Sequence, residues 1–271
     1  MADVRPVPRP VTLRSITLGD GTPAICVPLV AATADALAGR AAELADAAGP
    51  WRDAVDVVEL RLDHLTAVDD LDRVAEAVGV VRAALPDEVP VIATFRTKQE
   101  GGARDITPDA YGRLLERLIG LDAATRPDVV DVEMYTQPDV LERVVDAAHA
   151  AGIVVLLSSH DFTATPDRAE IVSRLVEQQE HGADVVKLAA MPREPADVLT
   201  LLAATEEFRR GPGLVPAVTM SMGALGAVSR LAGDTVGSAM TFGAAGEASA
   251  PGQVDARSLR AALRALGGTL G

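Results

Sequence analysis

The sequence contains few aromatic residues and a single cysteine. Of its 271 residues, 3% are aromatic and 48% are hydrophobic, so the core must be built mainly from Ala, Val and Leu. With Cys26 alone, no internal disulfide can form, and a reducing compartment fits this composition. Because Cys26 lies in the apolar run 24–30, we expect a buried, unreactive thiol.

Long apolar runs and basic clusters are also missing. No stretch approaches the roughly 18 uninterrupted apolar residues of a membrane span, and segment 1–14 lacks the apolar core of a signal peptide. The formal net charge is -14, and no Lys/Arg-rich run offsets it locally, which makes nucleic acid a poor partner. We therefore expect a cytoplasmic protein with no membrane and no nucleic-acid partner.

Cofactor motifs are absent as well. The Gly-rich segments 97–105 and 243–253 match neither a Walker motif nor a dinucleotide fingerprint. No set of His, Cys and Asp has the spacing of metal ligands. We therefore predict no bound nucleotide and no metal.

What the sequence does contain is a regular alternation of two patterns. Eight runs rich in Val, Ile and Leu predict strands over 24–30, 55–63, 89–96, 129–135, 153–160, 184–191, 214–222 and 237–243. Segments with helical spacing follow them at 33–48, 68–85, 108–123, 138–151, 166–181, 194–209, 224–232 and 254–266. Pro108, Pro138 and Pro166 are predicted at first helical positions, and Gly152 and Gly182 at helix ends.

This alternation predicts the fold class α/β, as a (β/α)8 TIM barrel. An open doubly wound sheet is the alternative. The alternating segment 11–18 predicts a short N-terminal strand or hairpin that pairs locally, with a turn at 19–21. We expect one domain over 1–271, with residues 1–10 flexible.

Charged residues stand at alternate positions within the predicted strands. In the second strand Glu59, Arg61 and Asp63 share one face, and the other face is aliphatic. Since helices cover the outside of a barrel, these charges must face inward near the carboxyl-terminal mouth. The same alternation in the other strands predicts further inward side chains, namely Thr94, Arg96, Asp131, Glu133, Ser158, His160 and Lys187. Any one of them, such as Asp131 with Glu133, could instead form a purely structural ion pair.

Lys187 and His160 have the character of reactive groups. Apolar neighbours and nearby cations, Arg61 or Arg96, would make Lys187 a nucleophilic amine, although an ion pair with Glu59 or Glu133 is the alternative. His160 ends an apolar strand at the mouth, where an imidazole can exchange protons near neutral pH. A hydrogen-bonded loop histidine is the alternative there.

Several motifs resemble one family, the type I 3-dehydroquinate dehydratases, over roughly residues 11–260. They are Glu59-Leu-Arg61-Leu-Asp63, Phe95-Arg96 with Glu100-Gly-Gly, Asp131-Val-Glu133, Ser158-Ser-His160-Asp-Phe162, Val186-Lys187-Leu, Met220-Ser-Met222-Gly, Ser229-Arg230-Leu-Ala-Gly and Ser249-Ala-Pro-Gly-Gln253. Two residues depart from the family pattern: Ser159, where members commonly carry Asn, Tyr or His, and Pro28, where some carry Ser.

The resemblance implies a shikimate-pathway lyase that converts 3-dehydroquinate to 3-dehydroshikimate and water. Lys187 would form an imine with the substrate ketone, His160 would act as general base and then acid, and Glu100 would orient His160. It implies a substrate-binding set of Arg230 for the carboxylate, Glu59, Arg61, Arg96 and Gln253 for the hydroxyl groups, Ser249 in a closing loop, and Met222 and Phe242 as an apolar wall. The family also implies a homodimer with no metal or organic cofactor.

Two other functions remain open at this point. A class I aldolase or transaldolase would share Lys187 but normally needs a phosphate site, which is weak here. A catalytically inactive metabolite-binding barrel is the alternative from another class, because a fold alone implies no activity. The presence of Lys187, His160 and Glu100 argues against it.

Overall fold

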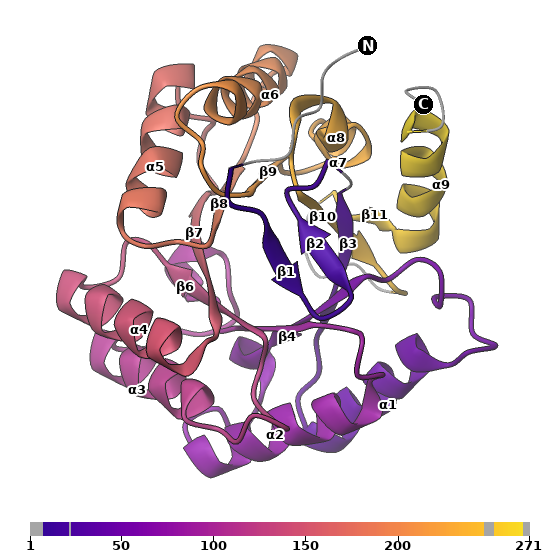
Figure 1. Ribbon diagram of the computed structural model, residues 1–271, viewed down its shortest axis with the longest axis vertical. Coiled ribbons are helices and arrows are strands. Elements are labelled where there is room, and N and C mark those ends of the chain that lie inside the picture. Colours follow the sequence, from indigo (N-terminus) through magenta and orange to yellow (C-terminus); the bar gives the residue numbers. More distant parts are fainter. Residues whose placement is uncertain (1–7, 22, 247–251, 268–271) are drawn as a thin grey trace.

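The computed structural model of the protein describes residues 8–21, 23–246 and 252–267. A curled, parallel, nine-stranded sheet is surrounded by helices (Figure 1). Its strands are β3 (Ala24–Leu29), β4 (Val57–Arg61), β5 (Val91–Thr94), β6 (Val129–Glu133), β7 (Val154–Asp161), β8 (Val185–Ala190), β9 (Ala217–Ser221), β10 (Met240–Ala244) and β11 (Val254–Asp255). The helices are α1 (Ala34–Ala45), α2 (Leu71–Ala84), α3 (Pro108–Ile119), α4 (Pro138–Ala151), α5 (Arg168–Glu180), α6 (Pro195–Arg210), α7 (Ala227–Leu231), α8 (Gly233–Val236) and α9 (Ala256–Gly267).

The sheet closes into a barrel. Strands β3 to β9 pair in chain order, and β10 returns to pair with β3. Between β9 and β10 the ring is joined by a bridge from Ala217 to Ser238, where the Ala239 amide donates to the Ala217 carbonyl at 2.7 Å. The predicted TIM-barrel fold is therefore confirmed, and the alternative of an open doubly wound sheet is wrong.

Most predicted elements are confirmed, with strand bounds that move by at most three residues. The predicted helix start at Pro166 is wrong: α5 begins at Arg168, because the Asp167 carboxylate caps it by accepting from the Glu170 amide at 2.9 Å. The predicted helix 224–232 is followed by the separate short α8. The first two residues of the predicted helix 254–266 instead pair with β10 as β11.

The N-terminal segment forms a hairpin of its own. Strands β1 (Val11–Leu13) and β2 (Ile16–Leu18) pair antiparallel, and Arg14 takes the left-handed conformation in the turn, with φ 49°. The expected strand or hairpin that pairs locally is confirmed as a hairpin, and the predicted turn at 19–21 follows it, with Gly19 and Gly21 at φ 89° and 107°. Segment 11–18 differs from a single strand only because the chain also reverses at Arg14. Of the expected flexible segment 1–10, residues 1–7 lie outside the described residues, and the Arg9 amide donates to the Leu214 carbonyl.

Two apolar cores leave only one end of the barrel for a site. One core lies between sheet and helices, where outward residues such as Ile25 and Leu60 are fully buried. The other lies inside the barrel and extends from Leu13 and Leu18 of the hairpin, past Cys26, to Met222 and Phe242 at the opposite end. The hairpin thus covers the amino-terminal end, and the carboxyl ends of the strands face the remaining opening. No helix among the described residues combines the length and apolarity needed to cross a bilayer.

Candidate active site

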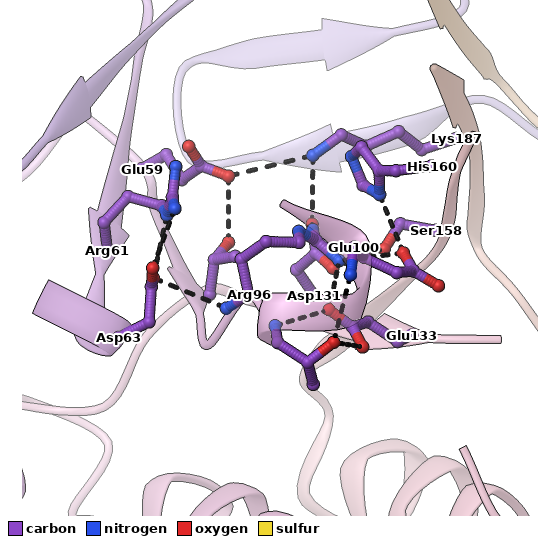
Figure 2. Close-up of polar contacts among 12 residues, drawn as sticks. Glu59, Arg61, Asp63, Arg96, Glu100, Asp131, Glu133, Ser158, His160 and Lys187 are labelled. Atoms are coloured by element: carbon purple, nitrogen blue, oxygen red, sulfur yellow. Dashed lines mark hydrogen bonds and ion pairs between the residues drawn. The ribbon is translucent and has the colours of Figure 1, made fainter. Parts of the chain in front are cut away.

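A cavity of about 610 Å³, open to solvent, lies at the carboxyl ends of the barrel strands. Ten of the eleven site residues expected from the sequence line it: Glu59, Arg61, Arg96, Glu100, His160, Lys187, Met222, Arg230, Phe242 and Gln253. The eleventh, Ser249, lies outside the described residues. Figure 2 shows six of the ten close together: Glu59, Arg61, Arg96, Glu100, His160 and Lys187. Alternate residues of each strand face the inside of the barrel, and the carboxyl ends of parallel strands meet at one end. Strand residues that are distant in the sequence therefore lie close together there.

Lys187 projects from β8 into this cavity and is 4% exposed. Its Nζ donates to Asp131 Oδ2 at 3.0 Å and lies 3.7 Å from Glu59 Oε1 (Figure 2). It also lies 4.6 Å from the centre of the Phe242 ring. The carboxylates of Asp131 and Glu59, rather than the expected Arg61 or Arg96, are thus the charges in direct contact with this amine.

Asp131 is the residue that the sequence-based site lacked. It is fully buried, and it accepts hydrogen bonds from Arg96 Nη2 at 2.7 Å and from Ser158 Oγ at 2.7 Å as well as from Lys187. Burial by itself would raise the pKa of Asp131, but the charges of Arg96 and Lys187 outweigh it and hold the pKa well below its ordinary value. Asp131 is therefore a fixed anion between two cations.

The remaining charges at the base of the cavity are also paired. Arg61 donates twice to the Asp63 carboxylate, with both distances 2.8 Å. Glu59 accepts from Thr94 Oγ1 at 3.0 Å. Because these partners hold the side chains in place, the cavity floor is preorganised before any ligand enters.

His160 and Glu100 form a second polar contact at the cavity wall, with His160 Nδ1 2.8 Å from Glu100 Oε2 (Figure 2). Burial, aided by the charges of Arg96 and Lys187, lowers the pKa of His160 well below its ordinary value. Burial raises the pKa of Glu100 to about 8. Both shifts favour the neutral forms, so the pair shares one titrating proton and behaves as a unit.

The segment that carries Glu100 is held by a compact turn. Thr97 caps it, and Glu133 accepts from the Thr97 amide at 2.8 Å and from its hydroxyl at 2.7 Å. The next residue, Gly101, has φ 85°, and a Cβ there would lie 2.1 Å from the Phe162 ring. Only glycine fits this close approach, which brings the turn that follows Glu100 against the Phe162 ring.

Arg230 supplies a cation from a different side of the barrel. It lies in α7, is 2% exposed and lines the cavity beside Met220. Burial lowers its pKa to about 10, so the guanidinium remains charged at neutral pH. It adds a fourth cation to Arg61, Arg96 and Lys187, each of which contacts a carboxylate.

Neither metal ligands nor a reactive thiol accompany these groups in the described part of the chain. No cluster of three or more His, Cys, Asp and Glu residues there is arranged to hold a metal ion. Cys26 is fully buried, as expected, and burial together with Glu59 raises the pKa of its thiol well above the ordinary value. The groups that do line the cavity include an amine, an imidazole and carboxylates.

The chain resembles known proteins over most of its length. Residues 25–269 match the family described as Type I 3-dehydroquinase. A 3-dehydroquinate dehydratase from Klebsiella pneumoniae (strain 342) is 43% identical over 250 residues, which cover 92% of this chain and 96% of that protein. A 3-dehydroquinate dehydratase from Listeria monocytogenes serovar 1/2a is 44% identical over 253 residues, covering 93% and 96%.

Solved structures agree with this similarity. A type I 3-dehydroquinate dehydratase from Clostridium difficile, solved with covalent modified comenic acid, superposes with a TM-score of 0.89 at 38% identity, covering 96% of this chain and 99% of that one. A 3-dehydroquinate dehydratase from Geobacillus kaustophilus HTA426 also gives 0.89, at 33% identity and coverage of 97% and 98%. Both the fold and the sequence thus point to one family.

Proposed function

Because this chain belongs to the type I 3-dehydroquinase family, the 3-dehydroquinate dehydratases of the shikimate pathway, we propose that it removes water from 3-dehydroquinate through a covalent imine on Lys187. The observation that carries the proposal is the buried Lys187 amine within the same cavity as the His160–Glu100 pair. Family membership makes the protein a hydro-lyase, so the aldolase and inactive-barrel alternatives are wrong.

The proposed reaction begins at the lysine. The Lys187 ammonium first gives up one proton, and the resulting amine adds to the ketone carbon. The ketone oxygen then leaves as water, taking up that proton and one more from the nitrogen, and a protonated imine remains. Asp131 and Glu59, which lie beside Nζ, stabilise the positive charge of this iminium. The iminium withdraws electrons from the adjacent C–H bond far better than the ketone does, so a weak base can remove that proton.

His160 then moves the proton. Its Nδ1 is held by Glu100, which leaves Nε2 for the substrate. Nε2 accepts the proton from the carbon next to the imine, forming an enamine, and returns a proton to the departing hydroxyl as the new carbon-carbon double bond forms. Hydrolysis of the imine releases 3-dehydroshikimate and restores Lys187. The net change is the loss of one water molecule.

The stereochemistry follows from the use of one imidazole for both proton transfers. The proton removed and the hydroxyl expelled must lie on the same face of the ring, which makes the elimination syn. Substrate deuterated stereospecifically at the carbon next to the ketone tests this. The deuteron on the face of the departing hydroxyl should be lost, and retention of that deuteron in the product would refute a single-base mechanism.

The other cavity residues are proposed to bind the substrate. Arg230 pairs with its carboxylate through two parallel hydrogen bonds, as a planar guanidinium can. The polar groups of Glu59, Arg61, Arg96 and Gln253 contact its hydroxyl groups, and Met222 and Phe242 form the apolar wall. Ser249, which lies outside the described residues, is a further proposed binding residue. We further propose that the protein acts as a cytoplasmic homodimer of single-domain subunits, without a metal or organic cofactor.

The His160–Glu100 pair sets the expected pH dependence. While Glu100 is protonated, its O–H donates to His160 Nδ1, which places the imidazole proton on Nε2 and blocks the base. Loss of the shared proton, at a Glu100 pKa of about 8, leaves a carboxylate that accepts from Nδ1–H and a free lone pair on Nε2. We therefore expect kcat/KM to rise as pH increases through about 8.

Glu100→Gln removes this titrating carboxyl but can still accept from Nδ1–H. The rising limb should then report His160 itself, whose pKa lies below its ordinary value, so it should move to lower pH while the maximal rate falls. Profiles of kcat/KM against pH for both proteins measure this shift. Superimposable rising limbs would show that Glu100 does not control the proton on His160.

A further inference from the structure

A polar side chain lies where an aliphatic one would be expected on α5. The face of this helix that packs on the sheet carries Ile171, Leu175 and Gln178, all with 0% exposure. An amide in such a place costs free energy unless its donors and acceptor are satisfied. The hydrogen-bond partners of the Gln178 amide therefore indicate its role.

The Gln178 amide holds the backbone of Lys187. The Lys187 N–H donates to Gln178 Oε1 at 2.9 Å, and Gln178 Nε2 donates to the Lys187 carbonyl at 3.0 Å. Gln178 Nε2 also donates to Ser159 Oγ of β7 at 3.2 Å. One side chain thus hydrogen-bonds to both the N–H and the carbonyl of Lys187, the proposed nucleophile. It does so from outside the barrel, on the side opposite to the cavity that Nζ enters.

This arrangement also accounts for Ser159, one of the two departures from the family pattern. Ser159 precedes His160 in β7, so its side chain faces outward while that of His160 faces the cavity. There the hydroxyl contacts Gln178 instead of the cavity groups. Gln178 therefore links β7 and β8 next to both His160 and Lys187.

Resting on the proposed function, we propose that Gln178 is a positioning residue that fixes the Lys187 backbone and so aims Nζ at the substrate ketone. Imine formation needs the amine on a narrow line of approach, and a displacement of the order of 1 Å can cost about a hundredfold in rate. Gln178 lies outside the barrel and does not contact the substrate. Its effect should fall on the formation of the imine, with little effect on substrate affinity.

The test compares Gln178→Met, which keeps the volume but loses the hydrogen bonds, with two controls. Leu175→Met changes an apolar side chain on the same face of α5, and Ser159→Ala removes only the third contact of the amide. For each protein, the rate of imine formation in a single turnover is measured by borohydride trapping, beside kcat, KM and the unfolding temperature.

The expected result is a fall of about tenfold to a hundredfold in imine formation and kcat for Gln178→Met, with KM within about twofold of wild type. Both controls should stay within about threefold of wild-type imine formation. If Gln178→Met loses stability but forms the imine at the wild-type rate, the inference is overturned and Gln178 is only a core hydrogen-bonding group. A wild-type protein that dehydrates the substrate without any trapped imine would instead overturn the proposed function.

Gln178→Glu provides a second test that does not depend on the folding of the Met variant. A protonated carboxyl can accept from the Lys187 N–H and donate to the Lys187 carbonyl, as the amide does, whereas a carboxylate can only accept. The ratio of its imine-formation rate to that of wild type should therefore rise as pH falls. A ratio that does not change with pH would count against the hydrogen-bonding role.

Discussion

Lys187→Ala is expected to lower kcat by more than about 10⁴-fold, because loss of an essential nucleophile removes the whole covalent route. Without the imine, the C–H bond next to the ketone is too weakly acidic for His160. The substitution also removes the cation that Asp131 and Glu59 both contact. Steady-state assays with identified product, together with thermal unfolding, separate lost chemistry from lost fold.

Lys98→Ala is the matched control. The sequence contains only these two lysines, and the Lys98 side chain is 68% exposed, 3.9 Å from Asp105. Its removal should leave kcat within about twofold of wild type, as expected for an exposed pair of little energetic weight. Substantial turnover by a folded Lys187→Ala protein would contradict covalent catalysis.

His160→Ala is expected to lower kcat by about 10²–10⁴-fold, the usual contribution of a general acid-base group. The imine should still form, since Lys187 and its carboxylate partners remain in place. Borohydride should therefore trap an adduct that still carries the hydroxyl group normally lost in the dehydration, because proton abstraction is the step that is lost.

This outcome distinguishes His160 from a residue that only shapes the cavity. A variant that traps dehydrated adduct at the wild-type rate would show that another group moves the proton. A variant that traps none would assign His160 to imine formation instead. Ser159→Ala, at the neighbouring outward position, is the control and should trap dehydrated adduct as wild type does.

The sequence was sufficient to place the charged strand residues, because helices cover the outside of the barrel and charged side chains must therefore face its interior. Glu59 and Arg61 alternate with Val58 and Leu60, and the helix-covered outer face accepts only the aliphatic pair. Proline and glycine similarly marked several helix ends. These are local rules, so they apply without knowledge of the neighbouring strands.

Contacts between strands could not be read in the same way. Parity places Asp131 inward, but its contact with Lys187 depends on the stagger between β6 and β8, which no local pattern encodes. The hydrogen bonds between the Gln178 amide and the Lys187 backbone depend on how α5 packs over the sheet. The turn at Arg14 was missed because a non-glycine residue adopts the left-handed conformation there.

The most direct test of the covalent mechanism is to incubate the wild-type protein with 3-dehydroquinate, reduce it with borohydride and map the adduct by peptide mass. We predict an adduct on Lys187 with the mass of the substrate or of its dehydrated product. With only one other lysine in the chain, the assignment is unambiguous. An adduct on Lys98, or none while the substrate is consumed, would contradict the mechanism.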